Sequence, residues 1–280
     1  MHPYLQLMRI ANCGMAAFAS IIAVLITFGI LVGGDITLFP ILDSLLVMTT
    51  VVLVTGAGNT INDYYDVHID SINRPDRPIP SGRVSAQNAL YFALFLFAAG
   101  IILAVLINYV CALIAIFNSF LLILYARNLK SMPLVGNVSV GYLTGSTFLF
   151  GGAIFGIDGI NALAVLFILA TFATIAREIV KDIEDIGGDL QEGAKTLPIV
   201  AGEKIAMVAA SSLGIIGIIA SPYPYFTGLL GEGYLYLVFL ADAVFVFAIL
   251  AILRGNPAKS SKLFKYAMFL ALFAFVAGSL

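Results

Sequence analysis

The sequence predicts an all-α integral membrane protein with nine transmembrane helices, its N-terminus inside and its C-terminus outside. The 280 residues are 61% hydrophobic and only 11% charged, a composition that soluble globular domains do not have. Apolar runs of about 20 residues, the length that crosses a bilayer core, recur along the whole chain. All 14 Lys and Arg residues can be assigned to one side of the membrane.

The composition also excludes several other classes of protein. The chain is too apolar to be disordered, and its 26 Gly and 10 Pro follow no collagen-like repeat. Cys13 and Cys111 both lie in apolar runs, so we expect buried thiols rather than metal ligands or a disulfide. A formal charge of −2 provides no basic surface for a phosphate backbone, so we expect no nucleic-acid partner. Nothing indicates an obligatory protein partner.

Nine apolar runs are the expected spans. In chain order they are Ile10–Val32, Ile41–Ile61, Ala86–Ile107, Tyr109–Ala126, Val138–Phe155, Ile160–Ile179, Ile205–Ala220, Leu235–Leu253 and Leu263–Leu280. Asn108 alone separates the third run from the fourth, and Gly156 to Gly159 separate the fifth from the sixth. We keep each pair as two spans, because a merged helix would be about twice as long as a bilayer is thick.

Basic residues set the expected orientation, because cytoplasmic loops collect Lys and Arg. With the N-terminus inside, Arg9 precedes the first span on the inner face. The inner loops or their flanks carry Arg74, Arg77, Arg83, Arg127, Lys130, Arg177, Lys181, Lys195, Lys204, Arg254, Lys259, Lys262 and Lys265. The outer loops contain Asp35, Asp158 and Glu232 and no Lys or Arg. A missed or additional span would have mixed the two sets.

Two expected inner segments, residues 62–85 and 177–204, are longer and more polar than a hairpin requires. Each begins with the pattern D-x2-D-x3-D. The motif residues are Asp63, Asp66 and Asp70 in the first segment and Asp182, Asp185 and Asp189 in the second. On a helix, this spacing places the three carboxylates of a motif within a sector of about 60°. Asn59 and Glu178 fall in the same sectors.

Three like charges in one sector repel one another, so we expect a cation beside each motif. Oxygen donors without a His or Cys cluster favour Mg²⁺, bridging to a phosphate-bearing substrate, over zinc or copper. Solvated helix ends would explain either motif alone. Two copies after spans two and six instead favour one shared cavity at the membrane face, and they suggest an internal repeat. We expect all six motif Asp residues to bind metal, and those with catalytic roles are Asp63, Asp66, Asp182 and Asp185.

Basic and aromatic side chains near the motifs are candidates for substrate binding. Arg and Lys bind the free oxygens of a diphosphate, although membrane topology alone also requires them on this face. The candidates are Arg74, Arg77, Lys130, Lys181 and Lys195, and Asn59 joins them from its helical phase. Tyr125 is the aromatic candidate that we include, and Tyr64, Tyr65 and Tyr142 are others. Interfacial belts of Tyr are the simpler explanation of these rings, because Tyr belongs at membrane interfaces whatever the function.

The motifs resemble those of the UbiA superfamily of intramembrane prenyltransferases. The resemblance rests on NDYYDVHID from Asn62 to Asp70, on NRPDRPIPSG from Asn73 to Gly82, and on the second motif with the following GAKTLP. It covers the whole chain as a single transmembrane domain, residues 1–280. It implies nine helices around a central lipid-accessible cavity, capped by cytoplasmic loops that bind Mg²⁺ and a prenyl diphosphate. It carries metal binding over to the six motif Asp residues and substrate binding to Asn62.

Within this superfamily, the segment REIVKDIED from Arg177 to Asp185 resembles the archaeal lipid enzymes. The resemblance implies Mg²⁺-dependent transfer of a geranylgeranyl group from geranylgeranyl diphosphate to geranylgeranylglyceryl phosphate, in the cell membrane and at its cytoplasmic face. Such a reaction must neutralise the leaving diphosphate and keep water from the allyl cation. The proton acceptor stays open between a motif carboxylate and the released pyrophosphate.

Two alternatives remain at this point. An aromatic acceptor, as in quinone biosynthesis, would share the diphosphate site, but a charged acceptor phosphate better explains the surplus of inner cations. An ion-coupled transporter would place its carboxylates near the bilayer midplane rather than at one face. Asp242 inside the eighth span and His68 beside the first motif receive no role.

Overall fold

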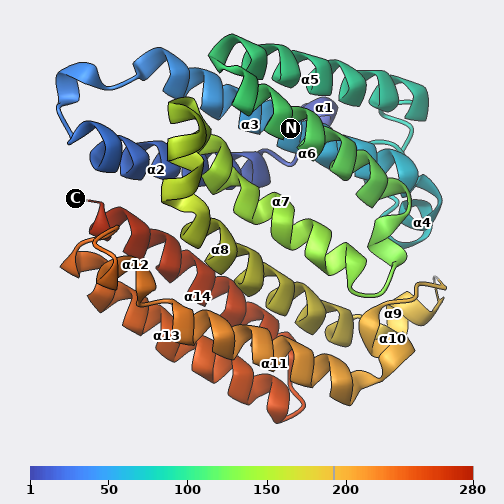
Figure 1. Ribbon diagram of the computed structural model, residues 1–280. Helices are drawn as coiled ribbons and strands as arrows, with labels where there is room; N and C mark the ends of the chain where they lie inside the picture. Colours follow the sequence, from blue (N-terminus) through green and yellow to red (C-terminus); the bar gives the residue numbers. More distant parts are fainter. Residues whose placement is uncertain (192, 280) are drawn as a thin grey trace. The chain divides into compact units, whose positions relative to one another are not determined.

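The computed structural model describes residues 1–191 and 193–279 (Figure 1). Its elements are α1 Pro3–Met8, α2 Ile10–Val32, η1 Ile36–Leu38, α3 Ile41–Tyr65, α4 Val67–Asn73, α5 Ala86–Ile107, α6 Tyr109–Arg127, η2 Leu129–Ser131, α7 Val135–Gly152, η3 Ala153–Phe155, α8 Gly156–Glu184, α9 Ile186–Gln191, α10 Leu197–Ala201, α11 Glu203–Ala220, α12 Tyr223–Phe226, α13 Glu232–Leu253 and α14 Pro257–Gly278. No strand occurs among these residues. The predicted all-α class is therefore confirmed.

The long helices follow the predicted spans, and they differ from them mainly at polar ends. α2 and α5 have the predicted bounds. α3 continues past the predicted end at Ile61, and α8 begins before Ile160 and continues past Ile179. These helices extend because backbone hydrogen bonding does not stop where the apolar run stops. For the same reason α11, α13 and α14 begin two to six residues before their apolar runs.

Eight helical stretches of the described residues are long and apolar enough to cross a membrane. The protein is thus an integral membrane protein by length and composition of its helices. The stretch Val135–Glu184 counts once among the eight and has 50 residues, where the sequence predicts two spans. One straight helix of that length would measure about 75 Å, more than twice a bilayer core.

This stretch is divided into α7 and α8, which pack as an antiparallel pair. Gly156 at the start of α8 has a φ of 68°, which a residue without a Cβ adopts freely. A Cβ on Gly141 would overlap Ile175, and a Cβ on Gly145 would overlap Thr171. A later residue of α7 therefore contacts an earlier residue of α8, so the two helices run in opposite directions. The described residues therefore contain nine long helices. The number of membrane crossings and their orientation stay predictions.

The chain divides into two compact units. The first comprises residues 1–27, 34–129 and 147–161, and the second comprises residues 28–33, 130–146 and 162–280. In the first unit α3 packs against α5 and α6, around Ile61 and Phe97. In the second unit α13 packs against α11 and α14, and Ile179 of α8 shares a core with Phe264 of α14. Each unit contains one Asp motif, and the single domain of residues 1–280 stays a prediction.

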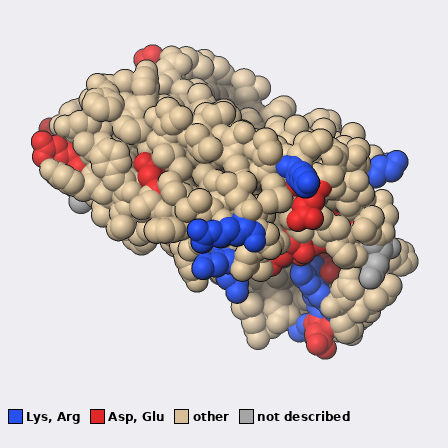
Figure 2. All heavy atoms as spheres, turned by 90° about the horizontal axis from the view of Figure 1, so that it is seen from below, with Lys and Arg blue, Asp and Glu red and all other residues tan. Residues whose placement is uncertain are grey.

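Large apolar side chains lie on the surface. Phe95, Phe120, Ile219 and Phe226 are more than half exposed. Water would penalise this exposure, whereas lipid tails are as apolar as these side chains. Figure 2 shows that charged side chains gather in a few patches on a face that other residues dominate. This surface is what a membrane-embedded chain requires.

Candidate active site

The first motif lies across the junction of α3 and α4. Asp63 belongs to the last turn of α3, Asp66 lies between the two helices, and Asp70 belongs to α4. Asp66 has a ψ of 4°, outside the α-helical range, so the uninterrupted helix assumed from the spacing is wrong at this residue. Helical hydrogen bonds nevertheless cross the junction. The N–H of Asp66 donates to the C=O of Asn62 at 2.9 Å, and the N–H of Asp70 to the C=O of Asp66 at 2.8 Å.

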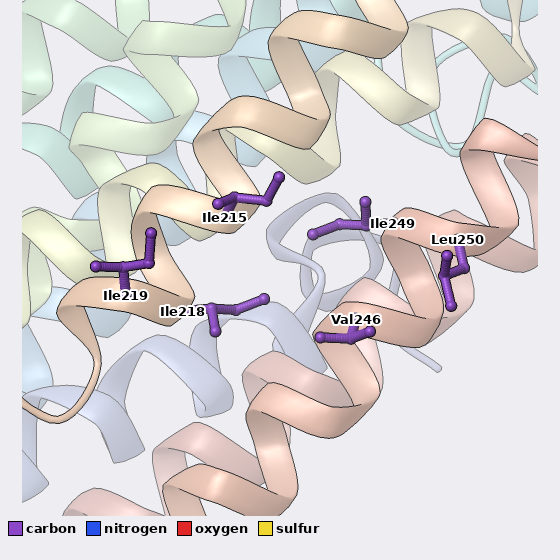
Figure 3. A pocket seen from close by; sticks show the side chains of 6 residues that line it. All are labelled: Ile215, Ile218, Ile219, Val246, Ile249 and Leu250. Atoms are coloured by element: carbon purple, nitrogen blue, oxygen red, sulfur yellow. The ribbon is translucent and has the colours of Figure 1, made fainter.

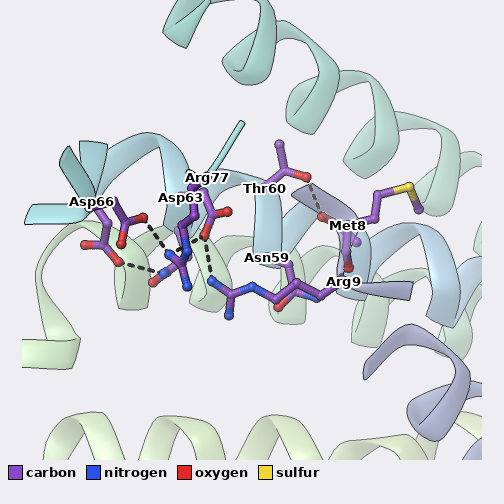
Figure 4. Close-up of polar contacts among 10 residues, drawn as sticks. Met8, Arg9, Asn59, Thr60, Asp63, Asp66 and Arg77 are labelled. Atoms are coloured by element: carbon purple, nitrogen blue, oxygen red, sulfur yellow. Dashed lines mark hydrogen bonds and ion pairs between the residues drawn. The ribbon is translucent and has the colours of Figure 1, made fainter. Parts of the chain in front are cut away.

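Two arginines neutralise the buried carboxylates of this motif (Figure 4). Asp63 and Asp70 are only 4% and 5% exposed. Arg77 Nη1 lies 2.5 Å from Asp70 Oδ2 and 3.2 Å from Asp63 Oδ1, and so joins the two. Arg9 Nη2 lies 2.6 Å from the same Oδ1 of Asp63. Buried carboxylates require such partners, because an isolated charge in this environment is very unfavourable.

The two predicted Asn residues of α3 have different partners. Asn62 Nδ2 donates to Asp66 Oδ2 at 2.7 Å and therefore belongs to the motif. Asn59 Nδ2 donates to the C=O of Met8 at 2.8 Å, so its amide nitrogen holds the end of α1. The side chain of Arg74, at the end of α4, is exposed. The structure thus brings Asn62, but not the amide nitrogen of Asn59, to the carboxylates.

The second motif repeats this local structure in the second unit. Asp182 belongs to the last turn of α8, Asp185 lies between α8 and α9, and Asp189 belongs to α9. The N–H of Asp185 donates to the C=O of Lys181 at 2.8 Å, and the N–H of Asp189 to the C=O of Asp185 at 2.9 Å. The helix is thus interrupted at the middle Asp of both motifs.

The charges of the second motif are less fully balanced. Asn137 Nδ2 of α7 donates to Asp182 Oδ2 at 2.7 Å. Lys181 Nζ lies 3.5 Å from Glu178 Oε2. No Lys or Arg of the described residues forms a salt bridge with Asp182, Asp185 or Asp189. Burial raises the pKa of Asp189 above its usual value, although a hydrogen bond with Thr196 and the charge of Lys181 lower it, and the charge of Asp185 adds to the rise.

The other predicted substrate residues lie on several elements. The N–H of Lys195 donates to the C=O of Ser131 at 3.1 Å, which places the loop after α9 beside η2 and its Lys130. The side chain of Lys195 is exposed, and that of Lys130 is half-buried. Tyr125 is half-buried on α6 of the first unit. The ring of Tyr142 packs edge to face against Phe167, with centroids 5.8 Å apart.

The donor atoms of both motifs suit a hard divalent cation. No three His, Cys, Asp or Glu side chains of the described residues lie close enough to hold a metal ion together. In the first motif arginines occupy the carboxylate oxygens instead. Each motif nevertheless offers three carboxylates with a neighbouring amide, Asn62 or Asn137, and such cations prefer oxygen ligands. A bound cation would add positive charge beside the carboxylates that Arg9 and Arg77 contact.

Arg9 and Asn137 contact the motifs, and neither was predicted as a residue of the site. Arg9 entered only the assignment of orientation, and Asn137 lies one residue before the predicted fifth span. A polar side chain at the inner end of an apolar run is the signal that both share. That signal is too common in membrane proteins to single them out.

A cavity of about 300 Å³ lies between α11 and α13 of the second unit (Figure 3). Its lining is aliphatic and consists of Ile215, Ile218, Ile219, Val246, Ile249 and Leu250. Because no polar side chain lines it, this cavity has no group that would bind a diphosphate.

Comparison with protein families and relatives agrees along the whole chain. The model of the UbiA prenyltransferase family matches residues 16–273. A relative from Methanosarcina mazei, named digeranylgeranylglyceryl phosphate synthase, is 59% identical and covers 98% of this chain and 97% of its own. A relative of the same name from Methanococcoides burtonii is 55% identical, with 100% of both chains covered.

Solved structures agree in fold. A structure from work on digeranylgeranylglyceryl phosphate synthase in membranes is 38% identical, with a TM-score of 0.86 over 99% of this chain and 97% of its own. A UbiA homologue from Archaeoglobus fulgidus, bound to DMAPP and Mg²⁺, has a TM-score of 0.71 at 18% identity and covers 96% of this chain and 99% of its own. At that identity the second likeness concerns the fold alone. The predicted UbiA-like fold is confirmed.

Proposed function

We propose, since this chain belongs to the UbiA prenyltransferase family, that it transfers a geranylgeranyl group from geranylgeranyl diphosphate to geranylgeranylglyceryl phosphate. The observation that carries this function is the identity of 59% and 55% to synthases of that name over nearly the full chain. These relatives support the archaeal ether-lipid reaction implied by the second motif. Neither of these two relatives is named for an aromatic acceptor or for transport.

Mg²⁺ is the proposed cofactor. Its ligands are the motif carboxylates of Asp63, Asp66, Asp70, Asp182, Asp185 and Asp189. The oxygen donors of both motifs fit such an ion, and a structural neighbour is described as bound to Mg²⁺. When bound, Mg²⁺ neutralises the diphosphate and helps it to leave. The premise is that both motifs serve one cavity at the cytoplasmic face of the cell membrane.

The basic residues bind the diphosphate in this proposal. Arg77 contacts two motif carboxylates, and it would bind free oxygens of a diphosphate held beside them. Lys181, Lys195, Lys130 and Arg74 add positive charge around the leaving group. Asn62 holds Asp66 in place, and Asn137 does the same for Asp182.

The apolar helices exclude water from the allyl cation formed when the C–O bond of the diphosphate breaks. The acceptor hydroxyl then forms the new ether bond and releases its proton. Its nucleophilic oxygen belongs to a lipid whose chain the bilayer already holds, so a membrane-embedded site brings both prenyl chains together. Tyr125 is proposed to line the path of the prenyl chain.

The decisive experiment supplies labelled geranylgeranyl diphosphate to membranes with either geranylgeranylglyceryl phosphate or 4-hydroxybenzoate. We expect prenylation of the glyceryl phosphate only, and reversible loss of this activity with a chelator. Asp63→Asn and Asp182→Asn should each lower turnover by about 100-fold or more. Matched controls are Asp43→Asn and Asp158→Asn, at the opposite ends of α3 and α8, which should retain activity. Prenylation of 4-hydroxybenzoate, or full turnover by either motif variant, would refute the proposal.

A further inference from the structure

Arg9 occupies a constrained turn beside the first motif. It lies between α1 and α2 with a φ of 52°, a left-handed conformation that is unfavourable for a residue with a Cβ. The preceding carbonyl, that of Met8, accepts hydrogen bonds from Asn59 Nδ2 at 2.8 Å and from Cys13 Sγ at 3.1 Å. The turn is therefore held from both α2 and α3. These contacts hold the backbone of Arg9 in place, so that its side chain extends to Asp63 (Figure 4).

The guanidinium of Arg9 has N–H donors that make no hydrogen bond within the described residues. Its Nη2 contacts Asp63 Oδ1 at 2.6 Å, while Nε and Nη1 donate to no group of the described residues. Its side chain is 34% exposed, so these donors are accessible. The neighbouring arginines are more fully engaged. Arg77 joins two carboxylates, and Arg83 bonds to Gln6 as well as to groups of its own loop.

The position of Arg9 suits the phosphate of a lipid. The residue directly precedes the first candidate span, Ile10–Val32, and lies at the level of Asp63 in the last turn of α3. The end of a span is where the phosphate groups of the bilayer lie. A guanidinium binds a phosphate monoester through two parallel N–H donors, which a single ammonium does not reproduce.

We propose that Arg9 binds the phosphate of the lipid acceptor. One nitrogen stays with Asp63, and the remaining N–H donors hold the phosphate, which brings the acceptor to the motif. Arg9 thereby makes the protein select a phosphorylated acceptor over the corresponding alcohol. This inference rests on the proposed function, because it assumes that the acceptor is a lipid phosphate. The diphosphate donor is held by other residues, chiefly Arg77.

The test compares Arg9→Gln and Arg9→Lys with the unchanged protein in steady-state kinetics. Two acceptors are used, geranylgeranylglyceryl phosphate and the unphosphorylated geranylgeranylglycerol, with geranylgeranyl diphosphate as donor. We expect Arg9→Gln to raise the KM for the phosphorylated acceptor roughly 10- to 100-fold, the effect of losing a charge-assisted contact. The KM for the donor should change less than about twofold, and the preference for the phosphorylated acceptor should fall by the same 10- to 100-fold factor. Arg83→Gln, which removes another guanidinium near α1, is the matched control and should change neither value.

Each alternative outcome has a distinct meaning. A fall in kcat or a rise in donor KM, with an unchanged acceptor KM, would overturn the inference and leave Arg9 as a residue that positions Asp63. Equal losses with both acceptors would overturn it as well. If Arg9→Gln does not fold, Arg9→Lys retains the charge but not the planar fork, and an unchanged acceptor KM in that variant would count against the inference. If the unchanged protein does not prenylate geranylgeranylglyceryl phosphate at all, the proposed function fails independently of Arg9.

Discussion

Replacing Arg77 with Gln tests how the negative charge of the first motif is balanced without a metal ion. Arg77 is the group that joins Asp63 and Asp70, at 3.2 and 2.5 Å. Its removal leaves Asp70 buried without that partner, while Arg9 still contacts Asp63. We therefore expect Arg77→Gln to unfold more easily than the unchanged protein when a chelator is present.

The size of the effect follows from burial. Removing one partner of a buried ion pair costs about 3–5 kcal/mol. The side chain of Arg77 is 19% exposed and one carboxylate keeps a second partner, so about 2–3 kcal/mol is expected here. That loss corresponds to a fall in Tm of roughly 4–12 °C. Millimolar Mg²⁺ should recover most of the loss, because a divalent cation satisfies the same oxygens.

The assay is thermal unfolding of purified protein in detergent, with chelator and with Mg²⁺. Arg74→Gln removes a neighbouring but exposed guanidinium and should leave Tm unchanged in both buffers. An unchanged Tm of Arg77→Gln in chelator would show that this ion pair does not stabilise the fold. An equal gain from Mg²⁺ in Arg77→Gln and in the unchanged protein would show that the cation does not replace the guanidinium.

Two further changes test contacts of the second unit. Asn137→Leu removes the donor to Asp182, so we expect the Mg²⁺ concentration at half-maximal turnover to rise by roughly 10-fold or more. Asn137→Ser should restore part of the loss, and an unchanged Mg²⁺ concentration at half-maximal turnover in Asn137→Leu would exclude a positioning role. Gly145→Ala adds a Cβ that overlaps Thr171 of α8 and should destabilise the protein by about 1–3 kcal/mol in thermal unfolding. Gly217→Ala, whose Cβ meets nothing within 4 Å, is its control, and equal Tm values for the two would contradict close α7–α8 packing.

Apolar length predicts most of the fold, because each long helix contains a run that only a bilayer accommodates. Apolar length predicts the ends of helices poorly where those ends are polar. For example, α8 extends five residues beyond its predicted end at Ile179. Short elements such as α1 and α10 were not predicted. They are too short for a hydrophobic period to be recognised, and tertiary contacts such as Asn59 to Met8 hold them.

Residue types in the motifs predict the carboxylates of the site, but the spacing does not predict their partners. Arg77 lies seven residues after Asp70 and turns back to it, whereas Lys195 lies six residues after Asp189 and is exposed. The difference comes from how each loop folds. Arg9 comes from a segment more than fifty residues away, and no local pattern connects it to Asp63.

The shared interruption of the two motifs supports the internal repeat more strongly than the shared spacing does. Three Asp residues at this spacing are compatible with many local structures, including a continuous helix. Both units instead end a long helix just before the middle Asp and resume a short helix just after it, at Asp66 and at Asp185. Hydrogen bonds of 2.8 to 2.9 Å cross both interruptions in the same register. Because the partners of the two motifs differ, common contacts do not explain this likeness, and the repeated backbone must be encoded by each motif itself.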